Sequence, residues 1–478
     1  MGKTDKEQYR NELAGCQMAI KDAKLPVIII LEGWGAAGKG SVISSLIKYM
    51  DPRFFKVYNM DVKSEDESRR PFLYRHAIRM PLAGQISIFD GGYMDELTRA
   101  YLHKKITAEE YDRTVDSIIN YERSLADNGY LVLKFFLDID KKTQKSRLKK
   151  LSEGKNTDWR VSKDDLWQNE HYDKCRKLYK KYLKDTDSEA APWHEIESVN
   201  KDDVERFIAR TVIESINGAI KKPRVGKVLD NPYPMAQVTP LSKIDLKGKE
   251  LSEEEYRKRL KELQKELSHL HNVLYLKKIP VIIAYEGWDA AGKGGNIKRI
   301  SSALDPRGYE VFPIASPTAD EKGRHFLWRF YNRLPKTGHI AIFDRTWYGR
   351  VMVERLEGFC SENDWQRAYR EMNEFEKDLT DWGAVVIKFW VQIDKDTQLE
   401  RFNLRQNTPE KQWKITDEDW RNREKWDLYE GAIDEMIAKT STAFAPWYIL
   451  ESNDKKYARI KALEIVIDRI KEAIDRQA

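Results

Sequence analysis

The two halves of this sequence match each other at one constant spacing. Adding 254 to a residue number in the first half gives its counterpart in the second, as for Lys39 and Lys293 or Asp90 and Asp344. The offset holds without an insertion from position 33 to position 193. Solenoid and propeller repeats run to only about 20–50 residues, so this pattern predicts a duplicated domain.

The length of the chain suits that prediction. Its 478 residues, 41% hydrophobic and 34% charged, suffice for two domains that each bury a core. Residues 222–240 contain four prolines and little periodicity, which is typical of an extended linker. We therefore predict an N-terminal domain over residues 1–222 and a C-terminal domain over residues 223–478, the second beginning with the proline-rich linker.

Composition excludes several classes of protein. The mean hydropathy is −0.69, and no apolar run reaches the roughly 20 residues that span a bilayer. The N-terminus lacks the apolar segment of a secretory signal. Cys16, Cys175 and Cys360 are far apart and show no metal-ligand spacing. We expect a cytoplasmic protein that does not bind a membrane. A net charge of +6 neither requires nor excludes a polyanionic partner.

Strand-like and helix-like patterns alternate within each copy. In the second copy, leucines recur at helical spacing over residues 256–274. Apolar runs bounded by glycine predict strands at residues 280–285, 310–315, 339–343, 385–393 and 448–450. This alternation indicates an α/β fold with a mostly parallel sheet flanked by helices. Such sheets bind ligands at the carboxyl ends of their strands.

A glycine-rich loop follows the first of these strands. The spacing from Gly287 to Lys293 is that of a Walker A phosphate loop, in which backbone N–H groups and the lysine bind phosphate oxygens. Gly294 stands where most such loops have a hydroxyl that binds magnesium, so we assign the metal to Asp289. The residues expected to contact phosphate through the loop are Gly287, Ala290, Ala291, Gly292, Lys293 and Gly294.

The strand at 339–343 ends in a carboxylate, as a Walker B strand does. Asp344 and Asp289 together would hold one or two Mg²⁺ ions that bridge the phosphates. The alternative is that Asp344 only caps the strand or pairs with Arg345. We favour the metal site.

Arginines follow Asp344 closely. Guanidinium groups bind phosphate oxygens bidentately and stabilise charge in a phosphoryl transition state, and we assign this role to Arg345 and Arg350. Glu354 on the same segment is a candidate for the acceptor's base or sugar. An ordinary carboxylate on a helix surface is the alternative for Glu354.

A third basic set spans residues 401–425 and is interleaved with tryptophans. Basic helices that close over phosphates form the lid of small kinases. We select Arg405 as catalytic, and Lys414 and Arg423 as substrate-binding. For any single lysine of this set, including Lys414, a solvated helix face is an equal alternative.

These motifs resemble the polyphosphate kinase 2 family. The resemblance rests on the segments Tyr285–Arg299, Leu304–Tyr309, Phe326–Phe330, Phe343–Arg350, Asp419–Trp426 and Ala445–Trp447. It covers the second copy and, more weakly, the first. It implies a thymidylate-kinase-like P-loop fold with a helical lid, Mg²⁺ as cofactor and inorganic polyphosphate as phosphoryl donor. Two-domain members resemble polyphosphate:AMP phosphotransferases, which make ADP from AMP.

The first copy departs from this pattern at several positions. Gly35 replaces the loop aspartate, and Gly91, Glu96 and Ala100 stand opposite Arg345, Arg350 and Glu354. Leu151 and Asn169 replace Arg405 and Arg423. Loss of these charges should remove several kcal/mol of transition-state stabilisation. We predict that the N-terminal copy is catalytically inactive.

The sequence leaves several functions open. We expect phosphoryl transfer from polyphosphate to AMP, and the alternatives are a polyphosphate-dependent ADP or GDP kinase, an ATP-dependent small-molecule kinase and a non-catalytic polyanion binder. The expected partners are polyphosphate and a nucleotide, with no nucleic acid. Duplication also suggests that the copies pack as a pseudo-dimer and leaves a homo-oligomer open.

Overall fold

The computed structural model describes residues 3–476, except for the side chains of residues 3–8, 10, 411 and 414. The chain forms two compact units, and each is described by itself. Unit 1 comprises Met1–Glu65, Phe72–Lys227 and Thr318–Trp328, and unit 2 comprises Asp66–Pro71, Val228–Pro317 and Arg329–Ala478. The domain boundary at residue 222 stays a prediction, because these units are not continuous in sequence.

Each unit therefore includes a short segment from the other half of the sequence. Within unit 2, Arg69 Nη2 donates a hydrogen bond to the carbonyl oxygen of Thr337 at 2.7 Å. Within unit 1, Trp328 Nε1 donates to the carbonyl oxygen of Ile78 at 3.2 Å. Both segments thus contribute specific polar contacts to the unit that contains them.

The first copy contains one five-stranded parallel sheet, in the order β2-β3-β1-β4-β5. Its central strand reads VIIILEG and is buried along its whole length, as expected of a strand covered on both faces. The elements are α1 (Lys3–Ala23), β1 (Val27–Gly33), α2 (Lys39–Ile47), η1 (Pro52–Phe54), β2 (Phe55–Asn59), α3 (Glu65–Ser68), α4 (Tyr74–Ala77), β3 (Ile86–Asp90), α5 (Tyr93–Leu102), α6 (Ala108–Asp127), β4 (Leu131–Asp138), α7 (Lys141–Ser152), η2 (Asp158–Arg160), α8 (Lys163–Glu170), α9 (Tyr172–Thr186), β5 (Trp193–Glu197) and α10 (Lys201–Lys221).

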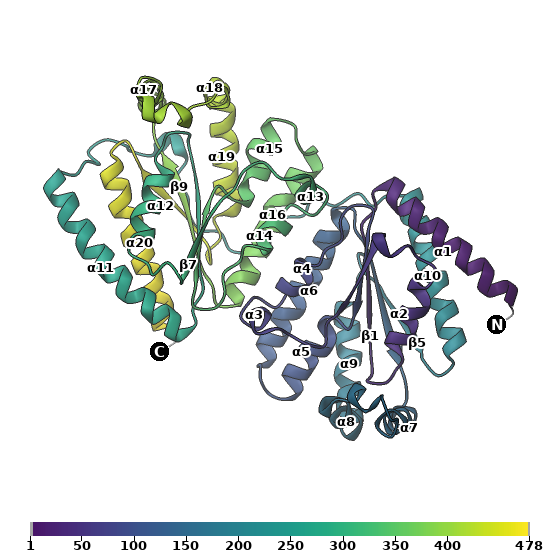
Figure 1. Cartoon of the computed structure of the whole chain (residues 1–478). Helices are drawn as coiled ribbons and strands as arrows, with labels where there is room; N and C mark the ends of the chain where they lie inside the picture. Colours follow the sequence, from purple (N-terminus) through teal and green to yellow (C-terminus); the bar gives the residue numbers. More distant parts are fainter. Residues whose placement is uncertain (1–2, 477–478) are drawn as a thin grey trace. The chain divides into compact units, whose positions relative to one another are not determined.

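The second copy repeats this arrangement in the order β10-β9-β6-β8-β7 (Figure 1). The predicted parallel α/β sheet is confirmed, and each expected strand lies within two residues of the observed one. The elements are η3 (Leu241–Lys243), α11 (Glu253–Lys277), β6 (Val281–Gly287), α12 (Lys293–Ser301), β7 (Tyr309–Pro313), α13 (Ala319–Lys322), α14 (Trp328–Tyr331), β8 (Ile340–Asp344), η4 (Trp347–Val351), α15 (Val353–Leu356), α16 (Glu362–Asp381), β9 (Val385–Gln392), α17 (Lys395–Gln406), η5 (Pro409–Lys414), α18 (Asp417–Glu424), α19 (Trp426–Thr440), β10 (Trp447–Glu451) and α20 (Lys455–Asp475).

Helices cover both faces of the second sheet. Helices α11, α12 and α20 lie on one face, and α16 and α19 lie on the other (Figure 1). The strand register pairs Tyr285 of β6 with Asp344 at the end of β8. The phosphate loop and the Walker B carboxylate therefore lie together at the carboxyl edge of the sheet. Among the described residues, none of the helices combines the length and apolar character needed to cross a lipid bilayer.

A buried ion pair lies in the core beneath this edge. Lys388 of β9 donates to Glu376 Oε2 at 2.7 Å and to the carbonyl oxygen of Thr440 at 2.7 Å. Burial lowers the pKa of Lys388, and the Glu376 carboxylate opposes that shift. The first copy has the same arrangement between Lys134 and Glu122. Such a pair is stable in a core only when its polar atoms are hydrogen-bonded, as both carboxylate oxygens of Glu376 are.

Candidate active site

The phosphate loop of unit 2 connects β6 to α12. Gly287 ends β6 with φ +154°, and a Cβ atom there would lie 2.6 Å from the carbonyl oxygen of Val391. Only glycine permits this close approach of two strands. Gly292 precedes α12 with φ +116°, and no side chain caps the helix. The first N–H groups of α12, at Lys293 and Gly294, are thus placed to bind an anion.

A pair of stacked indole rings holds the phosphate loop of unit 2 in place. The indole ring of Trp288 stacks on Trp426, with ring centroids 3.7 Å apart and planes inclined by 8°. Its Nε1 donates to Gln392 Oε1 at 3.0 Å. These contacts join the loop to β9 and to the start of α19, which limits its movement.

Arg401 braces the same loop from α17. It donates to the carbonyl oxygens of Ala290 and Ala291 at 3.0 and 2.9 Å, and to those of Ser452 and Asn453 at 2.6 and 3.0 Å. The basic set of residues 401–425 therefore includes one arginine that holds the loop together.

Lys293 and a buried carboxylate lie at the base of the loop. Lys293 Nζ donates to the carbonyl oxygen of Gly287 at 2.6 Å. Glu286 Oε1 accepts hydrogen bonds from the backbone N–H and the hydroxyl of Thr346, both at 2.7 Å. Burial raises the pKa of Glu286, and the positive charge of Lys293 opposes that shift. Glu286 thus connects the phosphate loop to the segment that follows β8.

Arg345 lies near one candidate metal ligand, Asp289, and directly follows the other, Asp344, in the sequence. Asp289 Oδ1 is 3.8 Å from Arg345 Nη2, and its Oδ2 accepts from Asn422 Nδ2 at 3.2 Å. Asp289, Glu286 and Asp344 all raise the pKa of Arg345 against the opposing effect of its burial. Among the described residues, no group of three or more His, Cys, Asp or Glu side chains could hold a metal.

This donor set fits Mg²⁺. Magnesium prefers oxygen ligands and is usually bound through one or two carboxylates, with water and substrate phosphates completing its coordination. Asp289 and Asp344 offer two carboxylates at the mouth of a phosphate loop, and the described residues provide no all-protein cage. The absence of a hydroxyl at Gly294 is consistent with this arrangement.

Arg345 has an unusual backbone conformation. Its φ is +67°, in the left-handed region that non-glycine residues rarely adopt. The matching residue of the first copy is Gly91, with φ +81°, which takes this conformation without strain. A side chain kept at such a position is often functional. The strain at Arg345 is consistent with its assigned contact to phosphate.

Arg350 and Glu354 lie together at the start of α15. Arg350 Nη1 is 2.9 Å from Glu354 Oε2, so the carboxylate assigned to the nucleoside pairs with the arginine assigned to phosphate. Arg355, the next arginine along the chain, instead pairs with Glu435 at 2.7 Å.

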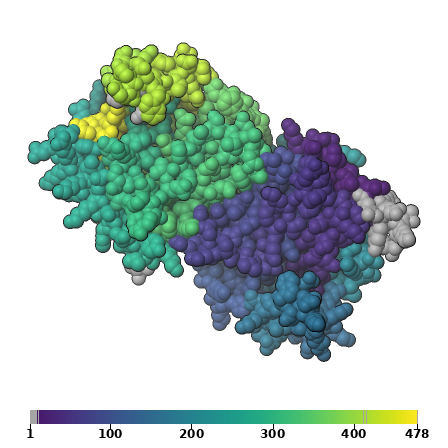
Figure 2. All heavy atoms as spheres, viewed as in Figure 1, coloured from purple at the N-terminus to yellow at the C-terminus, as the bar shows by residue number. Residues whose placement is uncertain are grey.

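Helices α17 and α18 and the intervening η5 form a lobe that protrudes from unit 2 (Figure 2). Arg423 of α18 donates to the carbonyl oxygen of Lys395 at 2.5 Å and to Gln398 Oε1 at 3.2 Å, so it joins the two lid helices. Arg405 lies on α17 near Arg401, whose pKa it lowers. The side chain of Lys414 lies outside the described residues.

Three residues at this site were not among those predicted from the sequence. Asn422 and Gln398 both contact Asp289, the first at its carboxylate and the second at its carbonyl oxygen at 3.1 Å. Glu286 is the third. One signal was available, because Glu286 and Gln398 are identical to their counterparts Glu32 and Gln144 in the first copy. The counterpart of Asn422 in the first copy is a glutamine, Gln168, so identity between the copies does not single out this position.

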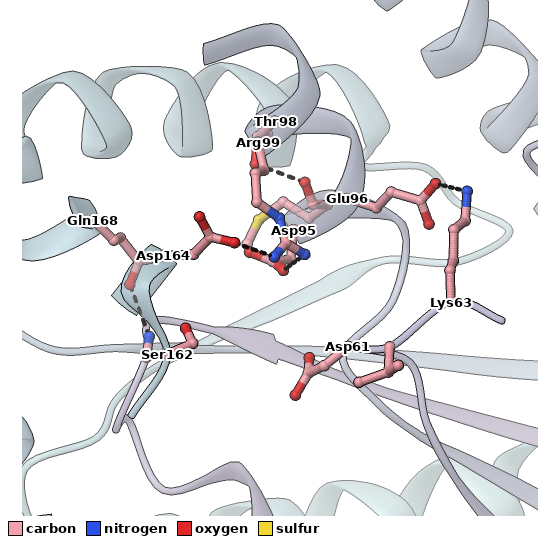
Figure 3. Close-up of polar contacts among 12 residues, drawn as sticks. Asp61, Lys63, Asp95, Glu96, Thr98, Arg99, Ser162, Asp164 and Gln168 are labelled. Carbon is pink, nitrogen blue, oxygen red and sulfur yellow. Dashed lines mark hydrogen bonds and ion pairs between the residues drawn. The ribbon is translucent and has the colours of Figure 1, made fainter. Parts of the chain in front are cut away.

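In the first copy, ion pairs occupy the corresponding region (Figure 3). Arg99 contacts both Asp95 at 2.6 Å and Asp164 at 2.8 Å. Glu96, which replaces Arg350, pairs with Lys63. A cleft of about 1620 Å³ is lined by Arg99 and its two aspartate partners. Its charged groups are neutralised by each other, which leaves less positive charge for a phosphate.

The phosphate loop of the first copy also has a different electrostatic environment. Burial lowers the pKa of Lys39, but Asp90, Asp61 and Asp95 together raise it above its ordinary value. A Cβ atom on Gly35 would lie 2.1 Å from Asp165 Oδ1, so the missing aspartate does not fit beside α8 as it stands. The carboxylates of Asp61 and Asp95 therefore lie near a phosphate loop that has no aspartate at position 35.

Known proteins match the chain over nearly its whole length. The family model of polyphosphate kinase 2 matches residues 1–224 and 250–478. A polyphosphate:AMP phosphotransferase of Pseudomonas syringae pv. tomato is 39% identical over 95% of this chain and 92% of its own length. A second protein of that name, from Pseudomonas aeruginosa, is 38% identical over 98% of this chain and 95% of its own.

The fold is matched in the same way. A crystal structure assigned to polyphosphate kinase 2 of Pseudomonas aeruginosa PA01 superposes with a TM-score of 0.86 and 36% identity, covering 100% of this chain and 98% of its own. The resemblance inferred from the motifs is thereby confirmed. Sequence match, duplicated fold and phosphate-loop geometry agree, and the chain belongs to the polyphosphate kinase 2 family.

Proposed function

We propose that the protein transfers a phosphoryl group from inorganic polyphosphate to AMP, giving ADP, at the phosphate loop of unit 2. One observation carries the proposal: the second copy has the complete set of loop, carboxylates and arginines in a chain that matches polyphosphate:AMP phosphotransferases over 95–98% of its length. A pure polyanion binder would not need this set. The lid and the phosphate loop also suit a long polyanionic donor.

In this reaction, a phosphate oxygen of AMP forms a bond to the terminal phosphorus of polyphosphate. The bond from that phosphorus to the bridging oxygen breaks, and the polyphosphate leaves one phosphate shorter. The attacking oxygen of AMP is already deprotonated at neutral pH, so no general base is needed. The protein's part is to orient the two phosphates and stabilise the charge that spreads over the transferred group.

The residues divide this work among them. The N–H groups at the start of α12 and the ammonium of Lys293 bind the transferring phosphate. Arg345 and Arg350 donate to the oxygens of this phosphate. Glu354 orients Arg350 until the nucleoside binds to Glu354. Asp289 and Asp344 would hold Mg²⁺, which supplies positive charge to the phosphates.

The first copy takes no catalytic part in this proposal. Its loop lacks the aspartate, and Glu96 places a negative charge where Arg350 supplies a positive one.

All three cysteines are free thiols. This suits a reducing compartment, and we propose a cytoplasmic location.

The test uses purified protein with Mg²⁺ and long-chain polyphosphate. AMP, ADP, GMP and GDP are supplied in separate reactions, and we expect the fastest turnover with AMP, giving ADP. Faster turnover with ADP or GDP would favour the second candidate, since NDP-polyphosphate phosphotransferase 3 of Ruegeria pomeroyi is 34% identical over 56% of this chain. Turnover with ATP as donor but not with polyphosphate would refute both.

A variant series locates the reaction. Asp289→Asn should lower kcat at least about a thousandfold, since it removes a charge at the metal site. Asp305→Asn is the matched control, because Asp305 lies outside the site and contacts Arg307 on the surface. Equal activity of the two variants would contradict the assignment of Asp289.

A further inference from the structure

Four arginines from three helices gather beside the first turn of α12. We call Arg299, Arg401, Arg405 and Arg459 the arginine patch. A Cβ atom on Gly295, two residues after Lys293, would lie 3.1 Å from Arg459 Nη2. Burial, together with the positive charges of Arg405 and Arg459, lowers the pKa of Arg401 to about 10. The patch therefore continues the phosphate loop towards α20.

Two members of the patch have no carboxylate partner among the described residues. Arg299 Nε and Arg459 Nη1 both approach the hydroxyl of Tyr256, at 3.3 and 3.5 Å. The Nε atom of Arg459 is buried and has no hydrogen-bond partner in the described part of the chain. Two guanidinium groups that share one neutral hydroxyl repel each other, unlike the paired Arg355 and Glu435.

The first copy serves as an internal comparison. Arg147, the counterpart of Arg401, makes the same bonds to the loop carbonyls, at 3.4 Å to Ala36 and 3.2 Å to Ala37. The bracing arginine is therefore part of the fold and is kept in both copies. The other three positions of the patch carry Ser45, Leu151 and Glu205 in the first copy.

The replacement of Arg459 reverses its charge. Glu205 forms an ion pair with Lys201 at 3.6 Å on the surface of α10. The fold thus tolerates serine, leucine and glutamate at these positions. Arginines at these three positions are found only in the copy that has the predicted catalytic residues, which ties them to the substrate and not to stability.

We propose that Arg299, Arg405 and Arg459 bind the part of the polyphosphate donor that extends beyond the phosphate loop, and so make the enzyme select long chains over short ones. The inference rests on the proposed function. AMP has one phosphate, and tripolyphosphate is short enough to be held by the loop. Only a longer polyanion contacts the loop and the patch at once, and each added charge-assisted hydrogen bond strengthens its binding.

The experiment compares two donors in two variants. Arg459→Glu and Arg299→Ser introduce the residues that the first copy has at these positions. For each variant, KM is measured with tripolyphosphate and with long-chain polyphosphate at saturating AMP. We expect the ratio of the long-chain KM to the tripolyphosphate KM to rise about tenfold over that of the unmodified protein. The difference should shrink at high salt.

The control removes one positive charge elsewhere in unit 2, as Arg299→Ser does within the patch. Arg257 is exposed on α11 and pairs with Glu253 at 2.8 Å, so Arg257→Gln should leave the KM ratio unchanged. Arg459→Lys, which keeps the charge, should recover most of the preference. An unchanged ratio in both patch variants, or an equal loss with both donors, would overturn the inference.

A direct measurement separates this inference from the reaction itself. Calorimetric titration with long-chain polyphosphate, without AMP, should show about tenfold weaker binding in Arg459→Glu. If the unmodified protein binds polyphosphate at the patch but does not phosphorylate AMP, the proposed function fails and the inference about the patch stands. Equal binding by the variant and the unmodified protein would refute the patch alone.

Discussion

Asn422 shows how one side chain of the lid acts on the chemistry of the loop. It donates to Asp289 Oδ2 at 3.2 Å, and the hydroxyl of Tyr429 donates to its Oδ1 at 3.3 Å. The amide therefore orients one oxygen of the carboxylate that we assign to magnesium. Partners that orient a metal ligand affect metal binding even though they do not touch the metal.

We expect Asn422→Ala to raise the Mg²⁺ concentration for half-maximal rate about tenfold. The KM for AMP should change little, because Asn422 contacts the aspartate and not the nucleotide. Titration of the initial rate with Mg²⁺ checks this. Tyr429→Phe should shift the same curve by less, and an unaltered Mg²⁺ dependence in Asn422→Ala would contradict the role.

A second residue sets part of the pH dependence of stability. His76 is buried in unit 1, 2% exposed, and its burial lowers its pKa well below the ordinary range, with the Arg75 and Lys63 charges acting in the same direction. The unfolded chain takes up a proton here below about pH 6.5, and the native chain does not. The native state therefore loses stability as the pH falls.

We expect the free energy of unfolding to fall by up to about 1.4 kcal/mol per pH unit between pH 6 and pH 5 on account of His76. Urea unfolding at each pH measures this slope. His76→Phe should flatten it, whereas replacement of the exposed His269 should not. An equally steep slope in His76→Phe would exclude this histidine as the source.

At the scale of elements, one arginine joins three parts of each copy, from α17 in unit 2 and from α7 in unit 1. Arg401 in unit 2 and Arg147 in unit 1 each donate to two carbonyls of a phosphate loop and two after the last strand. Removal of either guanidinium takes a donor from these carbonyl oxygens, of which, among the described residues, only those of Ala291 and Ala37 keep a hydroxyl donor, from Ser452 and Ser198 respectively. Each such loss destabilises the native state by about 1–3 kcal/mol.

Arg401→Gln and Arg147→Gln therefore form a matched pair. Both should lower the melting temperature, by about 5 °C or more, as differential scanning calorimetry would show. Arg401→Gln should also lower kcat at temperatures where the protein stays folded, because the loop that binds phosphate loses its brace. A similar loss of kcat in Arg147→Gln would contradict the assignment of catalysis to unit 2.

The elements also show why part of the site could be predicted and part could not. The strands at Val281–Gly287 and Ile340–Asp344 are buried on both faces, so they appear in the sequence as apolar runs that end at glycine and aspartate. The Asn422 contact to Asp289 joins residues 133 positions apart. No local pattern encodes a contact over that distance.

The Arg350–Glu354 pair was missed for a different reason. The sequence predicts a functional role for each residue. A spacing of four positions does not show whether their opposite charges pair with each other or face a ligand. The roles assigned to these residues stay predictions. What the repeat did encode was the distinction between copies, since Gly35 and Glu96 stand where Asp289 and Arg350 do.

At the scale of the whole molecule, one chain contains two phosphate loops that differ in the charged residues around them. Lys293→Ala should lower kcat at least about a thousandfold, since we assign this lysine to the transferring phosphate. Lys39→Ala removes the matching lysine from a loop surrounded by carboxylates and should leave kcat within about twofold. Steady-state rates with AMP and polyphosphate compare the two. A large loss in Lys39→Ala would show that the first copy takes part in turnover.

The stack of Trp288 on Trp426 gives the catalytic loop a spectroscopic signature of its own. Two indole rings stacked 3.7 Å apart in nearly parallel planes couple electronically, and the corresponding pair in unit 1 is Trp34 with Tyr172. The coupled indole signal in the near-ultraviolet circular dichroism therefore reports on the loop of unit 2. Donor binding that shifts this loop changes the overlap of the rings. Occupancy of the catalytic copy can thus be followed optically in the intact chain, without a label and without turnover.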